Sequence, residues 1–173
     1  MIDSSVTDFL GRYFELARRL FIDGQYALAS FFALTLIEEC GKVLYLRDAN
    51  IRSKEVRREA TAHTNKYIVA VINLLNASDR FNTLPQLLQS EADSWFDTER
   101  VMKLRNSALY LHFDMDGQLT TPNQMFERAQ VAMHVYLAGF VAVELGQYVK
   151  IDNNWINSIM ESAESFRKTY INT

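Results

Sequence analysis

Three residues, Arg105, Asn106 and His112, have the types and spacing that metal-independent RNA cleavage requires. Arginine binds phosphate through a planar fork of donors, and histidine titrates close enough to neutral pH to move protons. The reaction needs a base for the 2′-hydroxyl, an acid for the leaving oxygen and positive charge on the phosphorane. Positions seven apart on a helix differ by only about 20° around the axis, so a helix that continued to residue 112 would place Arg105 and His112 on one face.

One histidine cannot readily serve both ends of this reaction. The spacing therefore favours a homodimer in which a two-fold axis brings two copies of the site together. The alternative is an ordinary surface helix end, because an arginine and a histidine seven apart also occur by chance.

A second polar group, Glu38 to Lys42, interrupts a stretch otherwise built for burial. Buried carboxylates need partners, and His63 and Lys66 are the candidates on the next predicted helix. We expect Glu38, Glu39 and His63 to form one buried cluster with a structural role, so that substitution of His63 spares any chemistry. Gly41 would let the two helices approach closely.

Basic residues gather between Lys42 and Lys66, where seven Lys and Arg face three acidic residues. This excess predicts either a phosphate-attracting face, with Arg57 and Arg58 as candidate RNA-binding residues, or a plain solvated face. The sequence has no Glu-x-x-His pair of the di-iron type, no Gly-rich phosphate loop and no zinc spacing, so we expect no metal and no cofactor.

The elements that must position these residues are helical almost throughout. Apolar residues recur at spacings of three and four, and capping or turn residues separate the helices. We expect an all-α, up-down bundle of about five to six helices, with a small hairpin near residues 110–120 around the turn Asp114-Met-Asp-Gly117. The predicted helices span residues 6–21, 25–48, 53–74, 90–109, 121–150 and 152–170.

Composition bounds the class of protein. The chain has 173 residues, of which 49% are hydrophobic and 23% charged, and this favours a single domain over residues 1–173. A net charge of −3 excludes a globally basic nucleic-acid binder, and a single cysteine, Cys40, excludes an intramolecular disulfide. No targeting or membrane segment is visible, and Val131 to Leu145 is typical of a buried helix, so we expect a cytoplasmic protein without a membrane partner.

Several of these blocks, in this order and spacing, resemble the AbiV-type abortive-infection proteins of the HEPN superfamily over about residues 10–145. The most distinctive block is Glu38-Glu39-Cys40-Gly41-Lys42. The others are Ala27-Leu28-Ala29, His63-Thr-Asn-Lys66, Leu104-Arg105-Asn106 and Ala108-Leu109-Tyr110. The Arg-Asn…His element is similar to the broader HEPN signature, in which four to six residues separate arginine from histidine.

The resemblance implies a dimeric all-α HEPN bundle that acts in phage defence, as a metal-independent RNase or toxin that shuts down translation. The implied catalytic residues are Arg105, Asn106 and His112. The supporting polar cluster would comprise Glu38, Glu39, Lys42, His63, Lys66 and Tyr110. The alternative is a non-catalytic HEPN module that binds a phage, ribosomal or antitoxin-like protein. The position of His112, in a cleft with Arg105 or in a hairpin, discriminates between the two.

Overall fold

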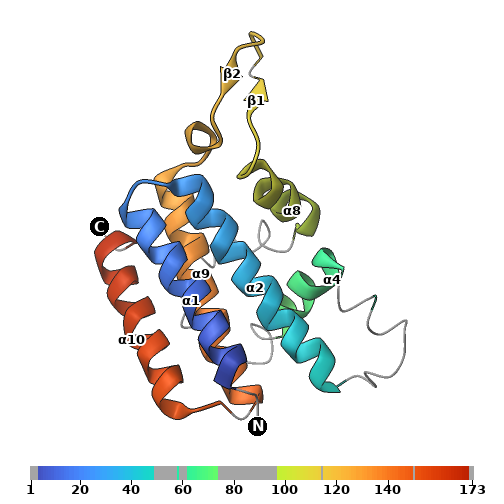
Figure 1. The fold of residues 1–173 in the computed structure, drawn as a ribbon, viewed down its shortest axis with the longest axis vertical. Coiled ribbons are helices and arrows are strands. Elements are labelled where there is room, and N and C mark those ends of the chain that lie inside the picture. Colours follow the sequence, from blue (N-terminus) through green and yellow to red (C-terminus); the bar gives the residue numbers. More distant parts are fainter. Residues whose placement is uncertain are drawn as a thin grey trace.

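Four long helices form the body of the molecule in the computed structural model, which describes residues 4–48, 58, 62–73, 97–113, 115–149 and 151–171. They lie side by side along the long axis (Figure 1). They are α1 (Ser4–Ile22), α2 (Tyr26–Asp48), α9 (Arg128–Tyr148) and α10 (Asn153–Tyr170). The protein is therefore all-α, as the sequence predicted.

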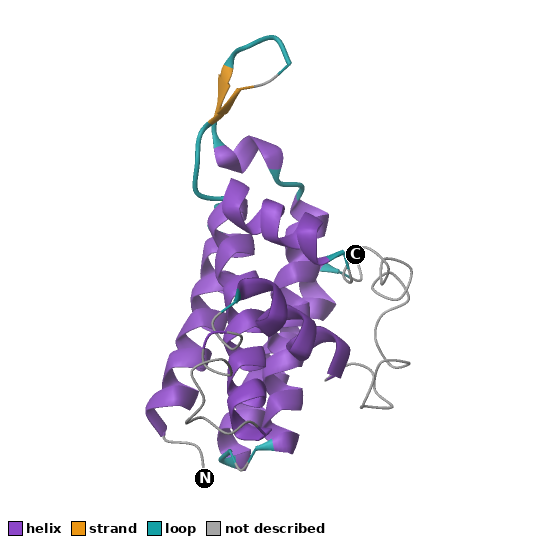
Figure 2. Cartoon of the chain, turned by 90° about the vertical axis from the view of Figure 1, so that its right-hand side faces the viewer, coloured by secondary structure: helices purple, strands orange, loops and turns teal. Residues whose placement is uncertain are grey.

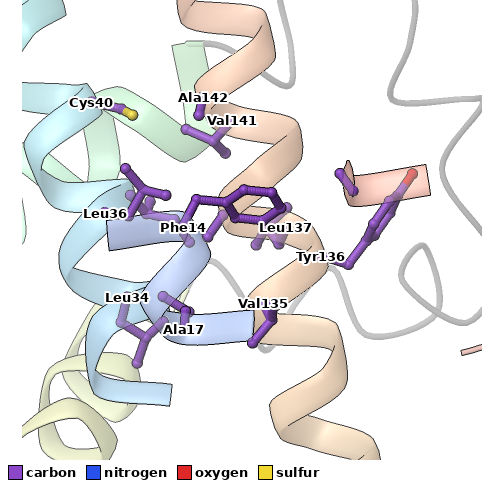
Figure 3. Packing of buried hydrophobic residues seen from close by; sticks show 14 of the residues in the cluster. Phe14, Ala17, Leu34, Leu36, Cys40, Val135, Tyr136, Leu137, Val141 and Ala142 are labelled. Atoms are coloured by element: carbon purple, nitrogen blue, oxygen red, sulfur yellow. The ribbon is translucent and has the colours of Figure 1, made fainter. Parts of the chain in front are cut away.

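The core lies where α1, α2 and α9 meet. Phe14 of α1 lies near Leu36 of α2 and Leu137 of α9, and Leu34 of α2 lies beside Ala17 of α1; all five side chains are buried (Figure 3). α9 is apolar and long enough to cross a membrane by composition, but 78% of its stretch Arg128–Gly146 is buried inside the bundle. A helix that is apolar all round belongs in such a centre.

Shorter elements cover one end and one side of the bundle. Beside α2 lies α4 (His63–Ile68), which continues as a π-helical turn (Val69–Asn73). α8 (Thr98–Ser107) leads into a hairpin of β1 (His112–Phe113) and β2 (Leu119–Thr120), and a 3-10 turn, η3 (Pro122–Met125), leads back to α9. Of these elements, α4 and α8 bring residues from distant parts of the sequence to Glu38, near the middle of α2.

The two-stranded hairpin projects beyond the end of the bundle (Figure 2). His112 pairs with Thr120 and Phe113 with Leu119 in antiparallel register. Gly117 closes the turn with a φ of +76°, a backbone conformation that glycine adopts without strain. The exposed large hydrophobic residues of this region are Leu109, Tyr110, Leu111, Phe113, Met115 and Leu119.

The return from the hairpin is tied to the turn between α1 and α2. The side chain of Asn123 accepts a hydrogen bond from the backbone N–H of Ala27 at 3.1 Å and donates one to the carbonyl of Gly24 at 2.9 Å. Gly24, with a φ of +74°, lies in the turn that separates α1 from α2. These bonds fix the base of the hairpin against the start of α2.

The predicted ends of α1, α2 and α10 are confirmed, as is the hairpin, and Asp152 caps α10 through its side chain. Three predictions were wrong. The third helix, predicted over residues 53–74, is not continuous, because residue 62 is non-helical and α4 begins only at His63; the predicted start at residue 53 lies outside the described residues. The fourth helix begins at Thr98, where the Asp97 side chain accepts from the N–H of Arg100. The capping box of Thr121 and Gln124 is present but opens η3, and α9 begins only at Arg128.

Candidate functional site

The carboxylate of Glu38 is the centre of the polar cluster. It is fully buried in α2, at the point where α4 and α8 both contact that helix. Its Oε2 lies 2.5 Å from Nδ1 of His63 and 3.6 Å from Nζ of Lys66, while its Oε1 lies 2.8 Å from Nε of Arg105. One carboxylate therefore connects three helices through three basic side chains.

Glu39 extends this cluster toward the surface. Its Oε1 lies 3.2 Å from Nζ of Lys66, and its Oε2 lies 3.4 Å from Nζ of the half-exposed Lys42. The Lys66 side chain is only 6% exposed, so both of its carboxylate partners are needed to compensate for its burial. With His63 neutral, three cations face two carboxylates, and the cluster carries one excess positive charge.

Gly41 permits the close packing of α2 on α4 on which this cluster depends. A Cβ at position 41 would lie 1.8 Å from the carbonyl oxygen of Lys66 and 3.1 Å from Cβ of Ala70. Any side chain there would force the two backbones apart. The predicted role of Gly41 is confirmed.

Arg105 contacts Glu38 and Phe31 of α2, and neither contact was predicted from the sequence. Its guanidinium lies over the ring of Phe31, 5.0 Å from the centroid, and only 13% of its side chain is exposed. Its Nη1 donates to Oδ1 of the exposed Asn106 at 3.2 Å. The sequence offered one signal for this contact, because Phe31 precedes Glu38 by seven positions and so shares its face of α2.

His112 does not lie beside Arg105. The helix ends at Ser107, with Ala108 as its C-cap, so the prediction that Arg105 and His112 share one helix face was wrong. Instead, His112 starts strand β1, and its Nε2 donates to the carbonyl oxygen of Ser107 at 2.8 Å. This bond satisfies one of the carbonyls that a helix end leaves without a partner.

The remaining candidates fall into three places. His63 contacts Glu38 as predicted, but the side chain is 56% exposed, so the expectation of a buried histidine was wrong. Tyr110 is largely exposed in the segment between α8 and β1, so it is not part of the buried cluster. Arg58 is exposed and is described without its neighbours in the sequence, whereas Arg57 lies outside the described residues.

Burial shapes the chemistry of the groups behind the cluster. Burial, with a smaller contribution from Glu39, raises the pKa of the Cys40 thiol well above its usual range. Burial and then the charge of Glu38 likewise raise the pKa of the Tyr67 hydroxyl. Both groups therefore stay neutral at physiological pH, and both belong to the buried core. Among the described residues, no three His, Cys, Asp or Glu side chains gather closely enough to hold a metal ion.

A separate buried histidine, His134, lies in α9. Its Nδ1 and Oγ of Ser30 are hydrogen-bonded at 2.7 Å. Burial, reinforced by the charge of Arg100, lowers the pKa of His134 to about 4. It is a buried core histidine whose ring is hydrogen-bonded to Ser30, and it is not part of the Glu38 cluster.

A protein-family model matches most of the chain. Residues 6–141 match the family model HEPN_AbiV, described as AbiV. No curated protein and no solved structure matches the chain. The matched region contains every residue of the Glu38 cluster and the whole hairpin.

Proposed function

Because the chain belongs to the HEPN_AbiV family, we propose that it is an abortive-infection protein that acts in the cytoplasm as a homodimeric, metal-independent RNase. RNA cleavage would shut down translation in the infected cell. The proposal rests on the arginine that the sequence singled out and on how the fold presents it.

The observation that carries the proposal is the fixed orientation of Arg105. Glu38 engages its Nε and Phe31 lies under its guanidinium plane, so the side chain is held without using its terminal nitrogens for the ion pair. Nη1 lies beside the exposed Asn106 at the edge of the site. A guanidinium oriented in this way can bind a phosphate and stabilise the charge that develops on it during cleavage.

The exposed hairpin supports the homodimer. Phe113 is 76% exposed, and a cluster of apolar side chains this exposed marks an interaction surface. Two-fold pairing through this surface would bring two hairpins, and thus two copies of His112, near one another. In the proposed reaction Arg105 binds the scissile phosphate, Asn106 orients it, and His112 transfers a proton.

A second candidate function is a non-catalytic module that binds a phage, ribosomal or antitoxin-like protein. The position of His112 in the hairpin, away from Arg105, favours it. The hydrogen bond between His112 and Ser107 adds to this, because it occupies Nε2 and ties the ring to the end of α8. The same exposed hairpin would then be the surface that receives the partner.

A cleavage assay with purified protein tests the proposed function. Wild type, R105A and H112A are incubated with total RNA in EDTA, and the product ends are identified. We expect wild type to leave cyclic or 3′-phosphate ends and both variants to lose activity by about 10²-fold or more. Intact RNA with wild type, together with growth arrest in cells that H112A reproduces, would replace the RNase with the binding module.

A further inference from the structure

We propose that His63 is a catalytic residue of this site and accepts the proton of the RNA 2′-hydroxyl through its Nε2. This inference rests on the proposed RNase activity and deepens it. It assigns a role in catalysis to a histidine for which the sequence predicted only a structural one.

The imidazole ring of His63 is oriented by the carboxylate of Glu38. Nδ1 of His63 lies 2.5 Å from Oε2 of the fully buried Glu38. An ionised carboxylate only accepts hydrogen bonds, so Nδ1 carries the hydrogen and the neutral ring has its lone pair on Nε2. The side chain is 56% exposed, and in the described part of the chain no hydrogen bond occupies Nε2. A histidine held by a buried carboxylate with its second nitrogen open is arranged as a general base.

The carboxylate that orients His63 also contacts Arg105. Arg105 contacts Oε1 of Glu38, and His63 contacts Oε2 of the same carboxylate. One buried group from α2 therefore orients both the phosphate-binding arginine from α8 and the histidine from α4. No corresponding contact places His112 beside Arg105 within one protomer, since His112 is bonded to Ser107.

Glu38 does not need His63 to compensate its negative charge. Lys66 and Arg105, which are 6% and 13% exposed, already place two cations against this carboxylate. A structural partner would also be expected to lie buried with them, yet His63 is the exposed member of the set. The exposure of His63 is what a residue that receives an RNA substrate from solvent requires.

The reaction then has two proton carriers. The 2′-oxygen of RNA attacks phosphorus while its proton passes to Nε2 of His63. The bond from phosphorus to the 5′-oxygen breaks, and the departing 5′-oxygen takes a proton from the protonated ring of His112 in the second copy of the chain. The products are a 2′,3′-cyclic phosphate and a 5′-hydroxyl, and Arg105 neutralises charge on the phosphorane between them.

The experiment uses two substitutions that separate the two nitrogens of the ring. In H63N the amide nitrogen replaces Nδ1 as the donor to Glu38, but nothing replaces Nε2. In H63Q the amide reaches the Nε2 position without proton-transfer ability. RNA cleavage, thermal unfolding and the pH dependence of kcat/KM are measured for both variants and for wild type.

We expect H63N to unfold near the wild-type temperature but to cleave RNA about 10²-fold more slowly, because a general base is lost. Wild type should lose kcat/KM toward acid pH, and this dependence should be absent from H63N. H63Q should show the same kinetic loss, and it decides the question if H63N fails to fold.

The outcomes separate the two proposals. If wild type cleaves RNA and H63N cleaves it equally well with an unchanged pH profile, His63 is structural and only this inference is overturned. If wild type cleaves no RNA while the protein is folded and dimeric, the proposed RNase activity fails and the inference fails with it.

Discussion

Oε1 of Glu38 and Nε of Arg105 lie 2.8 Å apart where α8 crosses α2, and the carboxylate is fully buried. This ion pair joins the block that interrupts the apolar helix to the arginine of the Arg-Asn…His element. It also makes the stability of the fold and the geometry of the site depend on the same contact.

Replacing Glu38 with Gln should destabilise the protein by about 3 kcal/mol or more, because the buried cations of Arg105 and Lys66 lose their shared counter-charge. Urea unfolding followed by circular dichroism measures the change in free energy. The matched control is E15Q, which breaks an exposed ion pair with Arg18 and should cost less than about 1 kcal/mol. Equal effects of the two substitutions would contradict the central role of Glu38.

Arg105→Lys should lower RNA cleavage by about 10²-fold, because an ammonium lacks the planar fork that binds phosphate and cannot lie flat on Phe31. Cleavage rates at saturating RNA measure the loss. Arg18→Lys is the control, since Arg18 pairs with Glu15 on α1, away from the cluster, and its substitution should leave the rate unchanged. A fully active R105K would show that charge alone suffices.

Gly41→Ala should destabilise the fold by about 1–3 kcal/mol or more, because the new methyl group would lie against the backbone carbonyl of Lys66. Thermal unfolding measures the effect. Gly11→Ala is a fitting control in another helix, since its Cβ would meet only the Trp155 side chain at 3.1 Å, which can shift. A neutral G41A would mean that α4 does not pack on α2 as closely as described.

His134 should make the protein sensitive to acid. Its folded-state pKa is about 4 and its ordinary value is 6.5, so between these values the unfolded state binds more protons. The stabilisation is complete above pH 6.5 and is lost as the pH falls toward 4, by up to about 3 kcal/mol. Unfolding free energies across this range should fall more steeply for wild type than for H134Q. Parallel curves would contradict the shift.

The hairpin should carry the homodimer. Phe113→Ser removes a largely exposed apolar side chain from β1 and should shift the protein toward monomer at tens of micromolar. Light scattering measures the mass. Ile22→Ser, which removes an exposed apolar residue at the end of α1, should leave the mass unchanged. A wild-type monomer at this concentration would rule out the proposed dimer.

Local signals in the sequence were sufficient for most of the bundle. Gly24 and Asp152 mark helix boundaries because each satisfies backbone groups within a few residues, and such signals are visible in a short window. The start of α8 was missed because a cap at Asp97 is no more evident in the sequence than one at Ser90, which lies outside the described residues; in the structure Asp97 caps α8. His112 was misplaced because α8 ends at Ser107 and strand β1 begins five residues later, at His112.

Some contacts of the site could be predicted from the sequence and others could not. The contacts of Glu38 and Glu39 with His63 and Lys66 were foreseeable, because both pairs lie on neighbouring predicted helices whose apolar faces must meet. The contact of Glu38 with Arg105 was not foreseeable. It depends on how α8 docks across α2, and no periodicity within either helix encodes that crossing.

The buried thiol of Cys40 gives this crossing a natural reporter. Cys40 is the chain's single cysteine and lies between Glu39 and Gly41, fully buried with a raised pKa. A thiol reagent can reach it only when α2 transiently separates from its neighbours, so the labelling rate measures the free energy of that opening. An RNA held across α4 and α8 would slow the labelling, and cysteine chemistry would then detect binding at the site without any engineered probe.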